Sequence, residues 1–167
     1  MVDHTQGWQG VETLGRPRAD TWSMASANVE LVRSIYAAWE RGDFSHSADW
    51  AHPEIEFEIA DGLDPVRLTG LAAMAAGYRE FLRAWEDVRF EVDGYRELDE
   101  ERVLVLGHYI GRGKRSGLEV GQISMRSAAV LYIKDARVRR LVNYFDRDRA
   151  FADLGLAREG DAVDATD

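Results

Sequence analysis

The second half of the sequence has four segments of strand character, separated only by short turn signals. These segments are 88–98, 102–113, 118–133 and 137–146. Charged and glycine residues between them, such as Asp99-Glu100-Glu101 and Lys134-Asp135, are typical of turns. Strands joined by such short turns pair antiparallel, because a parallel crossover needs a dozen or more residues. The second half is therefore predicted to form an antiparallel meander.

The first half of the sequence predicts helices instead. Apolar residues at helical spacing indicate a helix over residues 26–41, which Gly42-Asp43 ends. The later expected elements are a short helix at 44–50, a strand at 55–59, a loop after Asp61, a helix at 70–85 and a closing helix at 147–154. Helices followed by a meander give the order of an α+β fold and not the alternation of a parallel sheet.

The chain is long enough for one domain with a sizeable core. Its 167 residues predict three parts. Residues 1–25 have no apolar period and are predicted to be a flexible N-terminal extension. Residues 26–156 form the predicted domain, and residues 157–167 are predicted to be a flexible acidic tail.

Composition excludes several classes of function. The net charge of −9 argues against nucleic acid as a partner, because phosphate binding depends on basic patches. No cysteine is present, and no two histidines have metal-ligand spacing, so we expect no metal and no thiolate chemistry. The sequence has no apolar run of about 18 residues and no visible signal peptide. We therefore expect a cytoplasmic protein that does not enter the membrane.

Five stretches of the sequence occur together in one protein family. They are Asn28 to Phe44, His52 to Phe57, Leu68-Thr69-Gly70, Gly117-Leu118-Glu119-Val120, and Val138 to Arg147. In order and spacing they resemble the SnoaL-like branch of the nuclear transport factor 2-like superfamily, over about residues 26–156. The resemblance implies a cone-shaped α+β barrel, in which a curved, mostly antiparallel sheet wraps on about three helices. It also implies an apolar pocket at the open end and a homodimer formed through the outer face of the sheet.

Strand alternation places Leu141, Asn143 and Phe145 on one face of their strand. By resemblance this face lines the pocket, and Asn143 stands where SnoaL-type cyclases carry a catalytic aspartate. An amide donates and accepts hydrogen bonds but does not exchange a proton near neutral pH. Asn143 is therefore either a pocket residue or a structural hydrogen-bonding group. Asp146 either orients a ligand or caps the helix that follows, and the cap is the favoured interpretation.

Two further residues are candidates for acid–base chemistry. His108 lies in the middle of a predicted strand, and histidine is the side chain best suited to proton transfer at neutral pH. Glu58 lies near the place where the related ketosteroid isomerases carry their basic aspartate. The alternation of Glu56 and Glu58 with Ile55, Phe57 and Ile59 also fits a simpler picture, with the acids outside and the apolar residues inside.

Aromatic residues are predicted to form the pocket wall. The candidates that could contact a ligand are Tyr36, Trp39, Trp50, Phe57 and Phe145. Gln122 is a further candidate. It shares a face with Ser124 and Arg126, but a bulge near Gly121 would turn this row outward.

The leading functional hypothesis is a SnoaL-like pocket protein for a small hydrophobic carbonyl compound. Its chemistry would be acid–base catalysis without a cofactor: cyclisation, isomerisation, dehydration or hydrolysis. The alternatives are a non-catalytic ligand-binding or dimerisation module and a protein-interaction scaffold. A histidine or carboxylate in the cavity would favour the enzyme, whereas a lining of rings and amides would favour the binding module.

Overall fold

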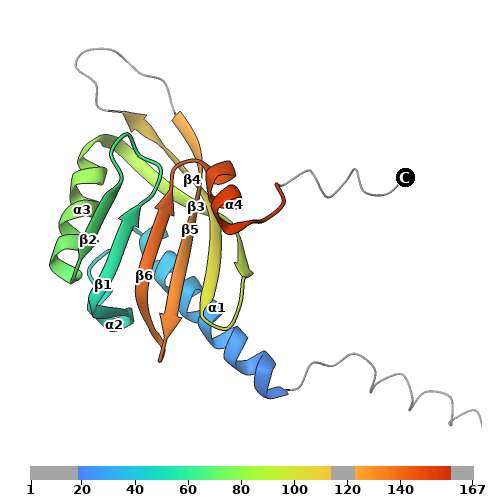
Figure 1. Cartoon of the computed structure of the whole chain (residues 1–167). Coiled ribbons are helices and arrows are strands. Elements are labelled where there is room, and N and C mark those ends of the chain that lie inside the picture. The colour runs from blue at the N-terminus through green and yellow to red at the C-terminus, as the bar shows by residue number, and fades with distance from the viewer. Residues whose placement is uncertain (1–18, 114–122, 159–167) are drawn as a thin grey trace, which may run out of the picture.

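The architecture is α+β, with four helices and one six-stranded sheet (Figure 1). It comes from a computed structural model that describes residues 19–113 and 123–158. The helices are α1 (Ala19–Glu40), α2 (Ser47–Trp50), α3 (Leu71–Arg83) and α4 (Arg147–Leu154). The strands are β1 (Ala51–Ile59), β2 (Val66–Thr69), β3 (Trp85–Glu97), β4 (Arg102–Gly113), β5 (Ile123–Lys134) and β6 (Arg137–Tyr144).

The sheet has the strand order β2-β1-β6-β5-β4-β3. Strands β3 to β6 form the predicted meander, and each pairs antiparallel with the next. Strand β1 pairs antiparallel with β2 but parallel with β6. The predicted α+β class with a mostly antiparallel sheet is therefore confirmed, and one parallel contact joins the two halves of the chain.

The two faces of the sheet carry separate apolar clusters. On the inner face, Val32 and Ile35 of α1 and Met74 of α3 pack against strand residues such as Val105 and Leu141. On the outer face, α4 covers the other cluster, which comprises Leu104, Ala128, Val130, Val142, Tyr144, Ala150 and Phe151. In Figure 1, α1 and α4 accordingly lie on opposite sides of the sheet.

Two glycines and an aspartate set the helix ends. The turn that follows α1 contains Gly42, whose φ of +77° is in the left-handed region that glycine tolerates. The side chain of Asp146 accepts a hydrogen bond from the backbone N–H of Asp148, which makes Asp146 the N-cap of α4. Gly155, with φ of +66°, is the C-cap of α4. The closing helix thus has the predicted bounds of 147–154.

Several element boundaries differ from the prediction, and three of the differences matter most. α1 begins at Ala19 and not at residue 26, while most of the predicted extension and tail lies outside the described residues. β2 lies between the predicted loop and the predicted helix of 70–85, where no element was expected; Val66 to Thr69 alternate in burial and pair with the edge of β1. β3 already begins at Trp85, a residue that the helical spacing assigned to the preceding helix.

The early start of β3 depends on an irregularity in its pairing with β4. The register shifts between Glu86 and Arg89. Within this shift Asp87 has a backbone φ of +53°, a value that residues other than glycine rarely adopt. A second shift falls between Val92 and Gly94. Such bulges bend a strand and re-aim its side chains, and hydrophobic periodicity does not reveal them.

None of the helices in the described part of the chain is both long enough and apolar enough to cross a membrane.

Candidate functional site

A cavity of about 350 Å³ lies between the inner face of the sheet and the ends of α1 and α3. Four parts of the chain line it: the end of α1 with the loop after it, α3, β3 and β4. The lining residues are Trp39, Glu40, Arg41, Gly42, Phe44, Tyr78, Phe81, Leu82, Val88, Arg89, Phe90 and Tyr109. This volume is at the lower end of the range of about 300–1,000 Å³ that is usual for ligand pockets.

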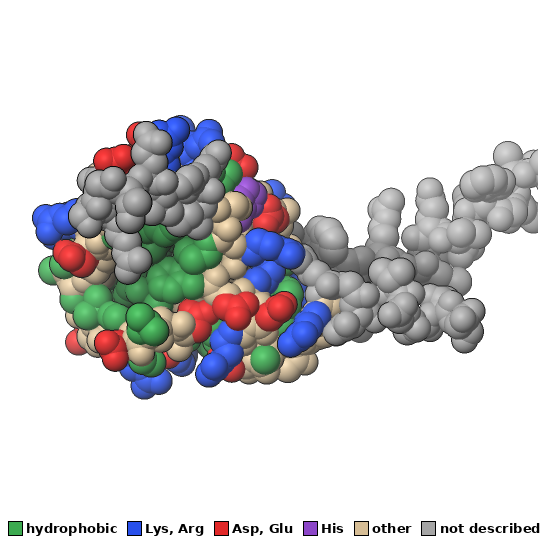
Figure 2. Space-filling view, turned by 90° about the horizontal axis from the view of Figure 1, so that it is seen from above, with side chains coloured by type: hydrophobic (Ala, Val, Ile, Leu, Met, Phe, Trp, Pro, Cys, Tyr) green, Lys and Arg blue, Asp and Glu red, His purple; other side chains and the backbone are tan. Residues whose placement is uncertain are grey.

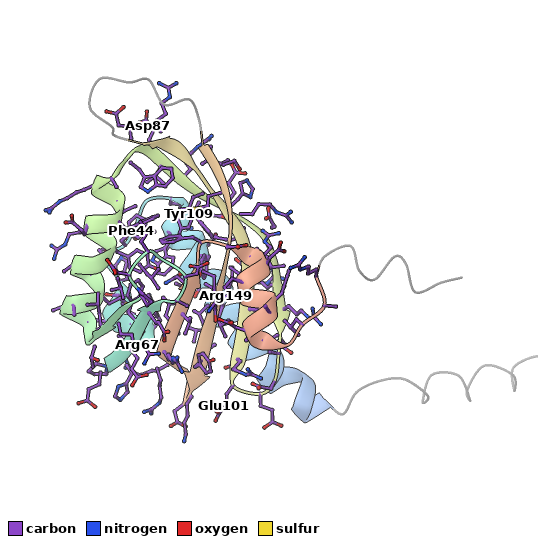
Figure 3. All side chains as sticks on the ribbon, turned by 45° about the horizontal axis from the view of Figure 1, so that its top comes forward. Phe44, Arg67, Asp87, Glu101, Tyr109 and Arg149 are labelled. Atoms are coloured by element: carbon purple, nitrogen blue, oxygen red, sulfur yellow. The ribbon has the colours of Figure 1, made fainter. Side chains whose placement is uncertain are left out.

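Half of the residues that line the cavity are aromatic, and their rings contact one another. The ring centroids of Trp39 and Tyr78 are 5.2 Å apart, those of Phe81 and Tyr109 5.1 Å, and those of Phe90 and Tyr109 4.7 Å. Figure 3 shows Phe44 and Tyr109 in the region between α3 and the sheet. These separations are typical of favourable aromatic pairs, so the wall is preorganised for a flat apolar guest.

Beneath this wall lie two polar atoms without partners. The phenol oxygen of Tyr78 and the amide nitrogen Nδ2 of Asn143 are buried, and neither makes a hydrogen bond with a described residue. They are close neighbours: a hydrogen-bonding influence of the Asn143 side chain partly opposes the rise in the pKa of Tyr78, although the two groups do not meet with the geometry of a full hydrogen bond. An unsatisfied buried polar group costs about 1–3 kcal/mol, so the interior is incomplete at this point.

Three phenols near the cavity are held in their neutral form. Burial raises the pKa of Tyr78 well above its usual value, and the nearby phenols of Tyr109 and Tyr36 raise it further. Burial likewise raises the pKa of Tyr36, with contributions from Tyr109 and Tyr95. Burial also raises the pKa of Tyr109. These groups remain protonated and are suited to donate hydrogen bonds without supplying charge.

Charged residues line only part of the cavity. Glu40, Arg41 and Arg89 are exposed, and the Glu40 carboxylate accepts a hydrogen bond from the backbone N–H of Val92 at 3.2 Å. When the molecule is viewed from above, hydrophobic side chains gather at the centre of the face and charged side chains surround them (Figure 2). The described cavity thus combines an apolar lining, charges at its exposed positions and neutral donors beneath.

The predicted aromatic residues divide into wall and support. Trp39 lines the cavity. Trp50 contacts Trp39 at a centroid distance of 5.7 Å, and Phe57 contacts Tyr78 at 5.0 Å, so both lie behind lining rings. Tyr36 is buried in the inner core, and Phe145 stacks on Phe81 at 5.6 Å. Gln122 lies outside the described residues.

The three residues predicted to be catalytic do not come together. Asn143 is on the inner face beside Tyr78. His108 points to the other face, where its Nδ1 is 3.0 Å from Oδ1 of Asp93 and its Nε2 is 3.4 Å from Oε2 of Glu91. Glu58 is also on that face, with a side chain 13% exposed that pairs with Arg140 at 2.8 Å. The sheet therefore separates both acid–base candidates from the cavity.

The outer face holds a polar cluster that the sequence analysis missed. The Arg147 side chain, which is 6% exposed, pairs with Asp93. Arg147 also donates hydrogen bonds to the backbone carbonyls of Gly107 at 2.9 Å and Ser127 at 3.3 Å. Since Arg147 is the first residue of α4, these bonds attach that helix to the sheet. In the described part of the chain, no histidine and acid side chains are grouped as a metal ion would require.

Sequence reasoning also missed Tyr78, Phe81 and Tyr109 as cavity residues. The helical stripe contained Tyr78 and Phe81, but its spacing indicated only a core-facing helix. Tyr109 follows His108 directly, so strand alternation places these two side chains on opposite faces. A parity count from the buried residues Val103 and Val105 was the signal that could have selected Tyr109 over His108.

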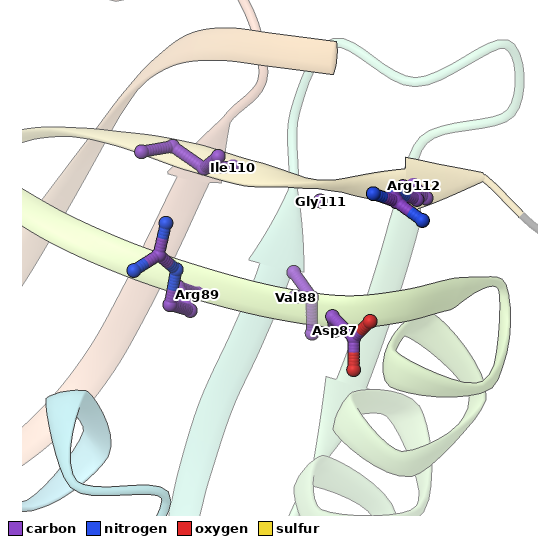
Figure 4. A pocket seen from close by; sticks show the side chains of 6 residues that line it. All are labelled: Asp87, Val88, Arg89, Ile110, Gly111 and Arg112. Atoms are coloured by element: carbon purple, nitrogen blue, oxygen red, sulfur yellow. The ribbon is translucent and has the colours of Figure 1, made fainter. Parts of the chain in front are cut away.

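A second hollow of about 390 Å³ lies over the irregular start of β3. It is lined by Asp87, Val88, Arg89, Ile110, Gly111 and Arg112 (Figure 4). Gly111 fits closely against β3, because a Cβ at this position would lie 3.1 Å from both the Val88 Cα and a ring atom of Trp85. This hollow is more open and more polar than the aromatic cavity.

Comparison with solved structures defines the class of fold as NTF2-like. An NTF2-like protein of unknown function from Burkholderia pseudomallei K96243 aligns with a TM-score of 0.63 and 19% identity, over 75% of this chain and 95% of that one. A candidate SnoaL-like polyketide cyclase from Jannaschia sp. CCS1 aligns with a TM-score of 0.63 and 12% identity, over 86% and 100%. TerC, co-crystallised with polyporic acid, aligns with a TM-score of 0.60 and 20% identity, over 77% and 97%.

The family follows from the sequence. Residues 32–141 match the SnoaL-like domain, so the chain belongs to the SnoaL-like domain family. The predicted resemblance is thereby confirmed. Comparison with curated proteins gave no match. The structural relatives include candidate polyketide cyclases, a candidate hydroxylase and proteins of unknown function.

Proposed function

We propose that this protein binds a small, flat, hydrophobic carbonyl compound in the aromatic cavity. The observation that carries the proposal is the pair of unpartnered polar atoms, the Tyr78 hydroxyl and the Asn143 amide, beneath a wall of aromatic rings. A ligand that fills the cavity and accepts a hydrogen bond would supply the missing partner. The co-crystallisation of the related TerC with polyporic acid gives this ligand class additional support.

The neutral character of the deep polar groups favours binding over acid–base catalysis. Tyr78 and Tyr109 are phenols whose pKa values are raised by burial, and Asn143 has no proton to exchange near neutral pH. The acid–base candidates His108 and Glu58 make their contacts on the other face of the sheet. We therefore assign hydrogen bonding to the ligand to Tyr78 and Asn143. We assign no proton transfer to His108 or Glu58.

The Tyr78 hydroxyl has almost no exposed surface in the free protein. A ligand carbonyl reaches it after rotamer changes among the lining side chains, a common adjustment on binding. Phe81 and Leu82 of α3 are only partly buried, so their side chains have room for such changes. The Trp39 ring in the same wall provides an intrinsic fluorescent reporter of the bound compound.

The proposal is tested with two compounds that differ in one carbonyl group, 2-acetylnaphthalene and 2-ethylnaphthalene. Quenching of tryptophan fluorescence measures the binding of each. A net hydrogen bond of about 0.5–1.5 kcal/mol predicts that the ketone binds about two- to tenfold more tightly. Tyr78→Phe and Asn143→Leu should each reduce this preference for the ketone.

Tyr132→Phe is the matched control, because it removes a phenol from the outer-face side of the sheet. It should leave the affinity for both compounds unchanged. Phe81→Ala should weaken both compounds alike, because it removes a ring from the wall. The proposal is overturned if neither compound binds, or if both bind equally to the wild type and to both donor variants.

A further inference from the structure

Phe44 is the exposed ring of the aromatic cavity. Among the described residues, Phe44 and Leu63 are the two large apolar side chains that are exposed, and the exposed fraction of Phe44 is 42%. Leu63 lies in the loop between β1 and β2 and lines neither the cavity nor the second hollow. Phe44 lines the cavity and lies in the region between α3 and the sheet (Figure 3). The cavity therefore has one aromatic ring that is partly open to solvent.

Phe44 makes fewer ring contacts than its neighbour Trp39. The centroids of the two rings are 6.1 Å apart and their planes are inclined by 30°. Trp39 also contacts Tyr36 at 4.9 Å, Trp50 at 5.7 Å and Tyr78 at 5.2 Å, whereas Phe44 contacts no second ring within the described part of the chain. Phe44 is thus the last ring of an aromatic series that reaches Tyr78, and part of its surface remains available to a guest.

A local turn holds Phe44 at this position. Gly42 lets the chain turn away from α1, and the backbone N–H of Asp43 donates to the carbonyl of Ala38 at 2.9 Å. The Asp43 carboxylate accepts hydrogen bonds from the backbone N–H of Ser45 at 3.1 Å and from its hydroxyl at 2.6 Å. Within the described residues, no hydrogen bond joins this turn to α3, β3 or β4. The Phe44 side chain can therefore adjust to a guest without breaking a hydrogen bond.

We propose that the Phe44 ring packs on the bound ligand and makes the cavity selective for aromatic compounds. The inference rests on the proposed function and deepens it, because it narrows the ligand class from flat hydrophobic ketones to those with an aromatic ring system. A pair of aromatic rings gains about two- to tenfold in affinity beyond the effect of the buried area alone.

Packing of Phe44 on the ligand also affects how long the ligand stays bound. The contact removes the exposed surface of the Phe44 ring and one side of the ligand from water, which favours the complex. Dissociation then requires this contact to open first. Differences in affinity among variants of one site arise mostly from the dissociation rate, so the loss of Phe44 should act mainly on that rate.

The test uses two ketones with the same carbon skeleton, 2-acetylnaphthalene and its saturated counterpart 2-acetyldecahydronaphthalene. Isothermal titration calorimetry measures the affinity of each. Phe44→Leu keeps an apolar side chain but removes the ring, so it should reduce the preference for the aromatic ketone about two- to tenfold. Phe44→Tyr keeps the ring and should retain the wild-type preference.

Phe44→Ala removes the whole contact and should weaken the binding of both ketones. Stopped-flow quenching of tryptophan fluorescence should show that 2-acetylnaphthalene dissociates faster from this variant than from the wild type. Because Phe44 is exposed, the urea midpoint of the free protein should not change in any of the three variants. This measurement separates an effect on the ligand from an effect on folding.

Leu63→Ala is the matched control, because it shortens the other exposed apolar side chain, which lies outside the cavity. It should leave both affinities and the dissociation rate unchanged. If Phe44→Leu leaves the ratio of the two affinities at its wild-type value, this inference is overturned and the proposed function stands. If neither ketone binds the wild-type protein, the proposed function fails and this inference fails with it.

Discussion

The two faces of the sheet differ in whether their buried polar groups have hydrogen-bond partners. On the outer face, the buried Arg147 guanidinium is bound by Asp93 and by two backbone carbonyls, and α4 covers the apolar residues around it. On the inner face, the Tyr78 hydroxyl and the Asn143 amide have no partner among described residues, and a cavity adjoins them. The chain itself completes the outer face, whereas the described residues leave the inner face incomplete, which is the basis of the proposed ligand site.

The difference also bears on the predicted homodimer. The apolar residues of the outer face that the family resemblance would place in a dimer interface are already buried under α4. Beside them, Glu58 pairs with Arg140 and Arg67, so that part of the face is charged. Dimerisation through the outer face stays a prediction, and an interface there would have to form over α4 and this charged region.

The largest expected effect comes from breaking the outer face. Arg147→Ala removes the buried guanidinium and leaves the carbonyls of Gly107 and Ser127 without their donor. Because Asp93 is 38% exposed, the main loss is that of the buried carbonyl acceptors, and leaving a buried acceptor without its donor typically costs about 1–3 kcal/mol. Urea unfolding monitored by tryptophan fluorescence should report a loss of this size.

Arg149→Ala is the control for that measurement. Arg149 is in the same helix but is exposed, and it pairs with Asp153 at 3.0 Å. Its loss should cost less than about 1 kcal/mol. Equal effects of the two substitutions would contradict the assignment of Arg147 as the residue that attaches α4 to the sheet.

A smaller effect of opposite sign is expected on the inner face. Tyr78→Phe removes a buried hydroxyl that has no partner, so the free protein should gain up to about 1 kcal/mol of unfolding free energy. Thermal unfolding should show a midpoint raised by about 2–4 °C. The same substitution weakens ketone binding, so stability and affinity change in opposite directions. A loss of stability would show that the hydroxyl has a structural partner.

The smallest effect is a dependence of stability on pH at Asp93. Partial burial raises its pKa, but the Arg147 hydrogen bond and the nearby His108 outweigh burial and lower the pKa overall. A lowered folded-state pKa stabilises the protein above the unfolded value of about 3.9, and this stability is lost as the pH falls through the folded value. Because Asp93 is 38% exposed, the contribution should stay below about 1 kcal/mol.

The measurement compares wild type with Asp93→Asn by urea unfolding at several pH values. The wild type should be the more stable protein at pH 6, and the difference should shrink as the pH approaches 3. A difference that stays constant over this range would show that the Asp93 charge does not stabilise the attachment of α4.

Much of the fold could be predicted from the sequence, because its elements depend on local patterns. The meander and the closing helix of 147–154 follow from turn signals and capping residues. β2 was missed because four residues at a sheet edge depend on pairing with β1 and carry little signal of their own. The bulge near Asp87 was missed because it reflects a fit between strands, in which Gly111 allows β3 to approach.

The candidate site was predictable only in part. Trp39 follows from the periodicity of its helix, and the inward side of Asn143 follows from strand alternation together with the family resemblance. His108 was selected for its chemistry, although its strand places it beside Leu106 and Asp93 on the outer face. Tyr78 and Asn143 become a pair only when α3 packs on the sheet over β1, the neighbour of β6, which brings together residues far apart in the sequence. Local patterns cannot reveal such a pair.

The parallel contact between β1 and β6 has a consequence for how the protein is made. β6 lies between β1 and β5, so β1 and β2 cannot join the rest of the sheet until residues 137–144 have been translated. While the nascent chain emerges from the ribosome, β1 therefore has no β6 to pair with. Long-range pairing of this kind slows folding and leaves an unpaired strand edge exposed to other chains. Completion of the sheet is thus coupled to the translation of β6.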